Sequence, residues 1–160
     1  MKKEITIAAC SAVALIILLG SVSYLLFPQV SVQGYTASID AYTQHGGKGS
    51  NVFGGNFSVS KRDNVTIYAE VRNASNIPQG GRLVSYEIHW PANGPQNGSI
   101  YAIGTNETNV SGITEIIRIP LWAPEFQVQN RDPLGTWLVY VTTSINEQSL
   151  SDTLTFSVQQ

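Results

Sequence analysis

Apolar and polar residues alternate along most of the chain after residue 28, and this pattern predicts a protein made of β-strands. The clearest case is residues 132–158, which read as two strands joined by a polar turn at Asn146. Apolar side chains occupy every second position over residues 137–141 and again over residues 154–158. Because successive side chains of a strand point to opposite faces, each strand is expected to bury one face and expose the other.

Five further segments carry strand signals at fairly even spacing and are separated by Gly, Pro and Asn. They are residues 35–41, 64–71, 83–90, 99–105 and 112–120. Together with the terminal pair, they predict an all-β protein in which two antiparallel sheets pack into a sandwich of about seven strands. The glycine-rich residues 44–56 are expected to form an irregular loop, and the proline-rich residues 120–133 a connection across one end.

The first 28 residues differ from the rest because they contain a long apolar run. Residues 5–27 are 23 positions without a charge, and a helix needs about 20 apolar residues to cross a bilayer. Two lysines precede this run, so the positive-inside rule places the N-terminus in the cytoplasm. We therefore expect a membrane anchor over residues 1–28 and an extracytoplasmic domain over residues 29–160. A cleaved signal sequence with a small-residue site near Ser23 is the alternative.

Composition argues against several classes of protein. Only 12% of residues are charged, and the net charge is −2. From residue 30 onward there are seven Lys or Arg against ten Asp or Glu, so no basic surface is expected and nucleic acid is not a predicted partner. The single cysteine, Cys10, lies in the apolar run. Neither a disulfide within the chain nor a thiolate metal site is therefore expected, and the exported domain has to be held together by packing.

No arrangement of residues predicts catalysis, and the chain is expected not to be an enzyme. Its two histidines, His45 and His89, lie in a glycine-rich loop and at a strand end, without a nucleophile motif. They lack the spacing of zinc ligands and the carboxylates are scattered singly, so no metal or cofactor is predicted. Asp132 is expected to stabilise a turn. Asp152 falls on the inward side of its strand; of two interpretations, an exposed strand start or a buried carboxylate with a hydrogen-bond partner, we favour the first.

Asparagine sequons are more frequent than chance. Ser and Thr make up 24 of the 132 residues after residue 28, so about two of the eleven asparagines should begin an N-x-S/T sequence, whereas six do. These are Asn56, Asn64, Asn73, Asn97, Asn106 and Asn109. The excess predicts N-glycosylation outside the membrane, and the alternative is a Ser/Thr-rich β protein with ordinary turns. The last two sequons are close enough to compete for a glycan.

Tryptophan side chains are the remaining candidates for contact with a ligand, because an indole ring can stack on a sugar. Trp137 follows the inward alternation of its strand and is expected in the core. Trp122 lies in the proline-rich connection and is the candidate for an exposed contact.

Four segments occur in a familiar order: "VTIYAEV", "LVSYEIHWP", "GTNETNVSGITEIIRIP" and "GTWLVYVT" followed by "DTLTFSV". Their most telling parts are the turn at Gly112 and the Gly135-Thr136-Trp137 sequence. This order resembles the macroglobulin-type immunoglobulin-like domains over residues 39–158. The resemblance implies an immunoglobulin-like β-sandwich on an archaeal cell surface rather than an activity. Protease trapping by large macroglobulins depends on a reactive cysteine, and the chain has none after its apolar run.

These patterns predict a non-catalytic, membrane-anchored extracellular module with a structural, adhesive or binding role. Its expected partners are the membrane, through residues 5–27, and other cell-surface proteins, further copies of itself or glycans. One alternative is a subunit of a pilus- or thread-like filament, in which residues 30–42 would pair with the sheet of a neighbour. Another is an accessory domain of a membrane enzyme complex, or a glycan-binding module that uses Trp122.

Overall fold

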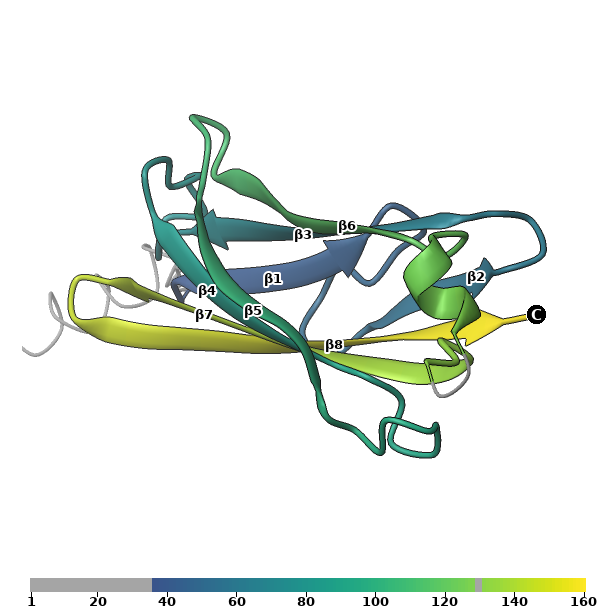
Figure 1. The fold of residues 1–160 in the computed structure, drawn as a ribbon. Coiled ribbons are helices and arrows are strands. Elements are labelled where there is room, and N and C mark those ends of the chain that lie inside the picture. Colours follow the sequence, from purple (N-terminus) through teal and green to yellow (C-terminus); the bar gives the residue numbers. More distant parts are fainter. Residues whose placement is uncertain (1–35, 129–130) are drawn as a thin grey trace, which may run out of the picture. The chain divides into compact units, whose positions relative to one another are not determined.

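The computed structural model describes residues 36–128 and 131–160 of the chain (Figure 1). Within these residues the fold is all-β, as predicted, with eight strands and one short 3-10 helix. The elements are β1 (Ser38–Thr43), β2 (Phe53–Ser58), β3 (Asn64–Arg72), β4 (Leu83–His89), β5 (Ile100–Glu107), β6 (Ile113–Pro120), η1 (Pro124–Gln127), β7 (Gly135–Ile145) and β8 (Gln148–Gln159).

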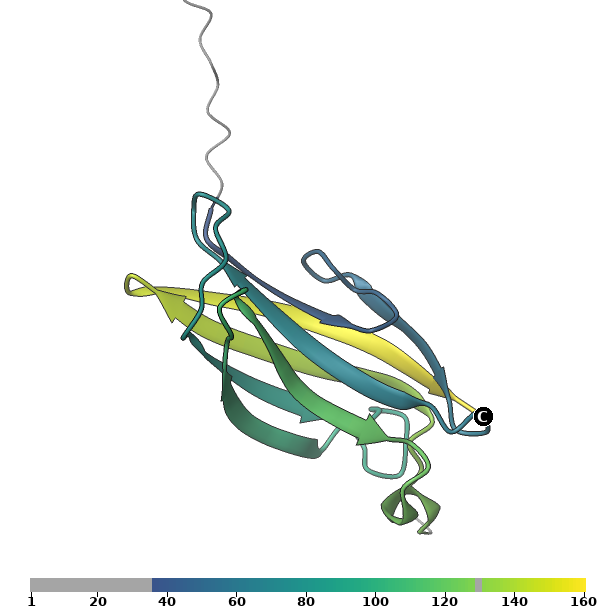
Figure 2. The same ribbon diagram turned by 90° about the horizontal axis from the view of Figure 1, so that it is seen from above.

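The strands form two sheets that pack face to face as a β-sandwich (Figures 1 and 2). The three-stranded sheet has the order β1-β3-β6, and the five-stranded sheet has the order β2-β8-β7-β4-β5. Neighbouring strands are antiparallel except β2 and β8, which are parallel. The predicted antiparallel sandwich is therefore wrong at this one pair.

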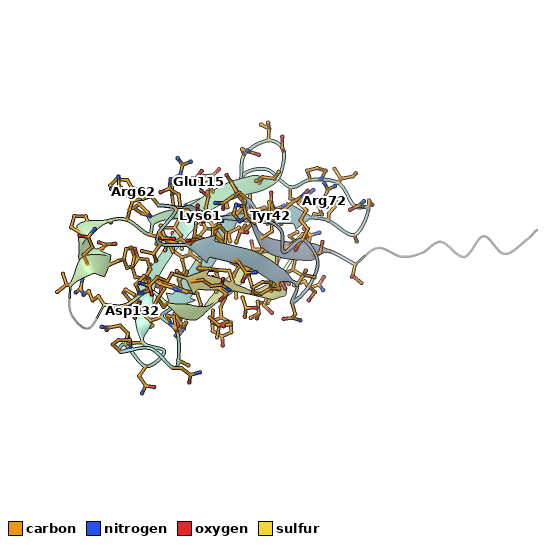
Figure 3. The ribbon with its side chains drawn as sticks, turned by 90° about the vertical axis from the view of Figure 1, so that its right-hand side faces the viewer. Tyr42, Lys61, Arg62, Arg72, Glu115 and Asp132 are labelled. Atoms are coloured by element: carbon orange, nitrogen blue, oxygen red, sulfur yellow. The ribbon has the colours of Figure 1, made fainter. Side chains whose placement is uncertain are left out.

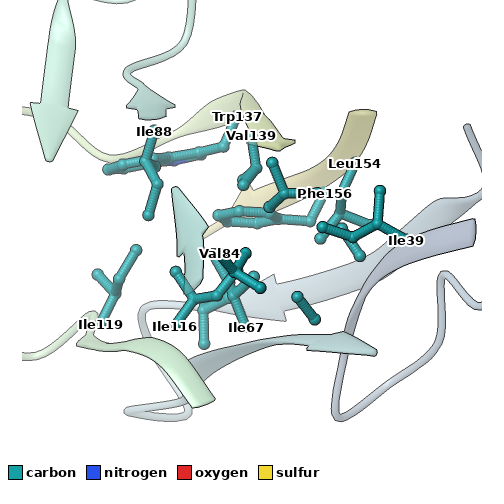
Figure 4. Packing of buried hydrophobic residues seen from close by; sticks show 14 of the residues in the cluster. Ile39, Ile67, Val84, Ile88, Ile116, Ile119, Trp137, Val139, Leu154 and Phe156 are labelled. Atoms are coloured by element: carbon teal, nitrogen blue, oxygen red, sulfur yellow. The ribbon is translucent and has the colours of Figure 1, made fainter. Parts of the chain in front are cut away.

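The core lies between the sheets and follows the predicted alternation. Trp137 is fully buried, as expected; its ring stacks on Phe156 and its indole N–H donates to the carbonyl of Pro133 at 2.8 Å. Figure 4 shows side chains from both sheets meeting in this layer. They include Ile39, Ile67, Ile116 and Ile119 from the three-stranded sheet, and Val84, Ile88, Trp137, Val139, Leu154 and Phe156 from the five-stranded sheet.

The terminal hairpin is present where the sequence predicts it. Ile145 pairs with Gln148, and the two residues between them, Asn146 and Glu147, have φ angles of 49° and 67°. Two consecutive residues with positive φ are the geometry of a type I′ turn, whose twist matches that of the flanking strands. Asparagine tolerates this conformation well, which explains the polar turn.

Strand β2 is the main departure from the predicted fold, because it lies in the glycine-rich residues expected to be irregular. It raises the number of strands in the described residues from about seven to eight. Phe57 is buried and meets Phe156 edge to face, which anchors the strand. A side chain at Gly54 would come within 2.9 Å of Leu154. The glycines therefore permit a close approach to β8 rather than preventing regular structure.

Asp152 is a second correction, because it is buried and not at an exposed strand start. The residue is 5% exposed. Its carboxylate accepts hydrogen bonds from the backbone N–H of Ala41 at 2.8 Å and of Asn51 at 3.2 Å. Since Ala41 belongs to β1 and Asp152 to β8, the first bond joins the edge of one sheet to the other sheet.

The two ends of the sandwich differ in what they carry. At the N-proximal end, β1 begins at Ser38 opposite Arg72, beside the turns of residues 73–82, 108–112 and 145–148. The C-proximal end carries the C-terminus, the β4–β5 loop and η1. In Figure 3, Arg72 and Asp132 lie toward opposite ends of the domain.

The predicted anchor over residues 1–28 lies outside the described residues. Within the described part of the chain, no helix is long and apolar enough to cross a membrane. The proline-rich connection over residues 120–133 contains the short η1 turn, so it is not wholly irregular.

Candidate functional site

A cleft of about 440 Å³ opens at the C-proximal end, on the side of the sandwich where the edge strands β5 and β6 face each other. Tyr101 and its neighbours on β5 form one wall, and Ile117 on β6 and Glu125 of η1 form the other. Trp90, which is buried, and Arg131, which is exposed, also line it. The cleft therefore combines aromatic surface with one acidic and one basic side chain.

The aromatic surface of the cleft is built by a bulge in the β4–β5 pair. Ile88 pairs with Ala102, but His89 pairs with Ile100, so Tyr101 is an extra residue on β5. Bulges re-aim side chains, and here the ring of Tyr101 meets Trp90 at 5.2 Å between ring centroids, edge to face. Tyr101 also meets Trp137 and Phe126, so the core aromatic layer continues into the cleft.

Two polar side chains of the cleft, Tyr101 and Glu125, are joined by a hydrogen bond. The hydroxyl of Tyr101 donates to Oε1 of Glu125 at 3.1 Å. Burial raises the pKa of Tyr101 to about 12, and the charge of Glu125 and this hydrogen bond add to the effect. The phenol is therefore a neutral donor at physiological pH. The arrangement can bind a polar ligand.

The backbone of β5 provides a further binding element. The N–H of Thr108 donates to the carbonyl of Arg82, so Thr108 is a hydrogen-bonded position opposite β4. Hydrogen-bonded positions alternate along an antiparallel strand pair. The backbone N–H and C=O groups of Ile103 and Thr105 therefore point away from β4. Ile103 is 70% exposed and Ile100 is 52% exposed. Over its eight residues β5 has no proline and only Glu107 as a charge. Edge strands are usually protected by charge, proline or covering chain. In β5 there is no proline, and the single charge is at its last residue.

A second hollow, of about 510 Å³, lies on the other side of Trp90 and is mainly apolar. Pro91, Leu138 and Thr155 are among its lining residues. The β4–β5 loop separates it from the cleft. His89 supports this loop, because its Nδ1 lies 2.8 Å from the carbonyl oxygen of Gly98.

The tryptophan predicted to make an exposed contact is indeed exposed but does not line the cleft. Trp122 is 50% exposed, and its indole N–H donates to Oδ1 of Asn64 at 3.3 Å. Trp90, by contrast, lines the cleft and is buried. The sequence therefore identified an exposed aromatic residue, but not the residues that form the cleft.

The histidines and Asp132 have local structural contacts. His45 is exposed and stacks on Phe57 at 4.4 Å between ring centroids, and His89 is partly buried with its Nε2 2.6 Å from Oε1 of Glu87. Asp132 accepts a hydrogen bond from the N–H of Leu134 at 2.9 Å, which confirms its predicted role in a turn. Within the described residues, no three His, Cys, Asp or Glu side chains are grouped as metal ligands.

The sequons are distributed over both ends. Asn56 on β2, Asn64 at the start of β3 and Asn97 in the β4–β5 loop are exposed. Asn73 and Asn109 lie in turns at the N-proximal end. Asn106 is a residue of β5; it and Asn73 are half-buried, whereas Asn109 is exposed.

Comparison with known proteins adds little to this geometry. No protein-family model matches the chain, and no curated protein matches it. Among solved structures, the chain is similar to the endo-β-1,4-mannanase from Thermotoga petrophila, with 13% identity and a TM-score of 0.43. The alignment covers 82% of this chain and 21% of the mannanase chain. A likeness of this size says nothing about activity.

Proposed function

We propose that the protein is a non-catalytic, membrane-anchored module of the cell surface that binds an extended segment of another surface protein. Residues 5–27 would anchor it with the N-terminus in the cytoplasm, and residues 29–160 would form an extracellular immunoglobulin-like domain of macroglobulin type. Positive φ angles at Gly112 and Gly135, the two glycines of the resemblance, support this relationship. They are 72° and 122°, a region that favours glycine.

The observation that carries this proposal is the unprotected edge of β5 beside the cleft. An extended peptide can add to such an edge through main-chain hydrogen bonds, while pockets beside the edge select its side chains. Ile103 and Thr105 offer outward-facing backbone groups, and the cleft next to them offers Tyr101, Glu125 and Arg131. The cleft lies at the C-proximal end of the domain, and β1 begins at the N-proximal end.

The test is to place a charge on the edge. Ile103→Lys should abolish binding by strand addition, because an edge lysine blocks pairing with a second chain. Val110→Lys is the matched control, since Val110 is 95% exposed in the turn after β5. On intact cells treated with a cross-linker, a specific adduct should form with the wild type and Val110→Lys and be lost with Ile103→Lys. An adduct that persists in a folded Ile103→Lys variant would contradict the proposal.

Glycan binding is the second candidate function, and the exposed indole of Trp122 favours it. An aromatic face can stack on a sugar ring and exclude water from it. Trp122→Ala should then lower retention of the protein on immobilised polysaccharide, whereas Val128→Ala, at another exposed position nearby in sequence, should not. Equal retention of both variants would remove this candidate.

The filament alternative requires that a strand already paired within the domain be released. Residues 38–43 of the segment proposed to pair with a neighbour form β1, which pairs along its whole length with β3 of the same chain. Strand donation would have to replace this pairing. Intact mass spectrometry of the protein from native membranes bears on the alternative, because a chain beginning near residue 30 would free the segment, whereas a chain of residues 1–160 would keep it tethered.

A further inference from the structure

The asparagines of two adjacent sequons, Asn106-Glu107-Thr108 and Asn109-Val110-Ser111, make opposite kinds of side-chain hydrogen bond. Glycosylation joins a sugar to Nδ2 of asparagine, so the surroundings of that nitrogen decide whether a glycan fits. In the transfer, a bond forms between Nδ2 and the anomeric carbon of a lipid-linked sugar phosphate. The bond from sugar to phosphate breaks, the lipid phosphate leaves with the electron pair, and the amide loses one proton.

Asn106 uses both hydrogens of Nδ2 within the fold. The nitrogen donates to the carbonyl of Glu115 at 2.8 Å and to that of Ile116 at 2.9 Å. Because Asn106 is on β5 and both acceptors are on β6, the side chain joins the edges of the two sheets. Thr108 is buried, and its hydroxyl donates to the carbonyl of Gln79 at 2.6 Å. A glycan on Asn106 would remove one amide hydrogen and force a sugar between β5 and β6.

Asn109 is held by its oxygen instead. Its Oδ1 accepts from the N–H of Ser111 at 2.8 Å and of Ile113 at 3.2 Å. The residue is exposed, and Nδ2 has no hydrogen bond with any other described residue. This oxygen-bound turn orients the amide nitrogen toward solvent, so a glycan on Asn109 would leave every hydrogen bond of the turn in place.

Asn73 is half-buried, and it repeats the hydrogen bonding of Asn109 through Oδ1 on a neighbouring turn. Its Oδ1 accepts from the N–H of Ser75 at 2.9 Å and of Ile77 at 3.0 Å. The two turns are packed together, because the N–H of Val71, two residues before Asn73, donates to the carbonyl of Gly112 at 2.8 Å. Both oxygen-bound sequons therefore lie at the N-proximal end of the domain.

We infer that Asn73 and Asn109 are N-glycan acceptors at the N-proximal end and that Asn106 stays unmodified as a hydrogen-bonded clamp between β5 and β6. The acceptor half of this inference rests on the extracellular location proposed above. The clamp half does not, since it follows from hydrogen bonds within the domain. The two acceptors lie at the opposite end of the domain from the cleft, so their glycans would leave the cleft open.

Glycopeptide mapping of the full chain from native membranes tests the acceptors. We expect glycans on Asn73 and Asn109 and an unmodified Asn106 in the folded, protease-resistant fraction. A glycan on Asn106 in that fraction would overturn the inference, and so would a folded chain without glycans on Asn73 and Asn109.

A pair of aspartate substitutions tests the clamp without any glycan. Both variants are made as the full chain in a host that does not glycosylate, and their thermal unfolding is followed in detergent. Asn106→Asp replaces the donor by an acceptor facing two carbonyls, and the Tm should fall by about 5–10 °C. Asn109→Asp keeps the bonded oxygen, and its Tm should stay within about 2 °C of the wild type. Equal Tm values for the two variants would overturn the clamp whatever the glycan map shows, so the two halves fail separately.

Discussion

Replacing Asp152 by alanine should destabilise the domain strongly, because it removes the acceptor that joins β8 to β1. The carboxylate accepts from Ala41 N–H at 2.8 Å and from Asn51 N–H at 3.2 Å. Ala41 is buried, so its N–H has no access to water once the carboxylate is gone. Asn51 is exposed and its N–H can bind water instead. The cost therefore arises mainly at Ala41.

The magnitude follows from this asymmetry. A hydrogen bond to a charged group contributes about 1.5–3 kcal/mol, and a buried donor left without a partner costs about 1–3 kcal/mol. Both figures describe the same N–H, that of Ala41, so they are not added together. We therefore expect Asp152→Ala to lower the free energy of unfolding by about 2–3 kcal/mol. Asp152→Asn can keep its oxygen on the N–H of Ala41. Its NH2 cannot accept from Asn51, but Asn51 is exposed and its N–H can bind water, so the cost should be at most about 1 kcal/mol.

Urea unfolding of the full chain, followed by tryptophan fluorescence, measures both changes. Trp90 and Trp137 are buried in the same aromatic layer, so their emission reports loss of the core. With a urea m value of about 1–3 kcal/mol/M, a loss of about 2–3 kcal/mol in Asp152→Ala should lower the midpoint by about 0.7–3 M. Asp132→Asn is the control for removal of a carboxylate, because Asp132 is exposed and its turn needs only one oxygen.

The order of the variants is the decisive result. If Asp152→Ala unfolds at the wild-type midpoint, or Asp152→Asn is as unstable as Asp152→Ala, the bond to Ala41 does not stabilise the sandwich. The second outcome would mean that the negative charge matters rather than the acceptor geometry.

Three further predictions concern single positions. Gly112→Ala should lower the free energy of unfolding by about 2–3 kcal/mol in the same urea assay, because φ is 72° and the new methyl would meet the carbonyl oxygen of Val71 at 2.7 Å. Burial alone would raise the pKa of Glu70, but hydrogen bonds from Lys48 and Arg72 outweigh it and the pKa is lowered from 4.5. The extra stability of wild type over Glu70→Gln should therefore be complete above about pH 4.5 and disappear as the pH falls through the lowered pKa. The pKa of Tyr101 is raised from 10 to about 12. The stability that its neutral phenol contributes should therefore be lost as the pH rises through this range. Tyr101→Phe should remove this loss of stability, and it should also remove one late step from a titration of tyrosine absorbance.

Most of the fold could be predicted because its strands obey local alternation. Val84 and Ile88 are buried on β4 as the pattern requires, and Trp137 lies in the core. Strand β2 escaped prediction because a glycine-rich sequence looks irregular until its neighbour is known. Asp152 escaped for a related reason. Its inward position was visible in the sequence, but its partner, Ala41, is 111 residues away.

Less of the candidate site could be predicted, because it depends on a bulge and on the open side of the sandwich. The alternation of residues 99–105 gives no sign that Tyr101 is the extra residue on β5. Its position is set by the pairing of β4 with β5, which is a tertiary property. The exposed Trp122 was predicted because prolines around it marked a surface connection. A sequence of this kind therefore reveals surface aromatic residues more readily than clefts.

Side chains that hydrogen-bond from one sheet to the other explain how a sandwich with no cysteine after residue 28 keeps its sheets in register. Packing of apolar side chains is not directional, so it holds two sheets together without fixing how they slide. Hydrogen bonds are directional, and the domain has them on both open sides. Asp152 and Thr43 make them on the side of β1, and Asn106 makes them on the side of β5 and β6. Toward the C-proximal end β5 and β6 line opposite walls of the cleft. The clamp at Asn106 would therefore hold the cleft walls at a fixed separation, which links the stability of the sandwich to the site proposed to bind a partner.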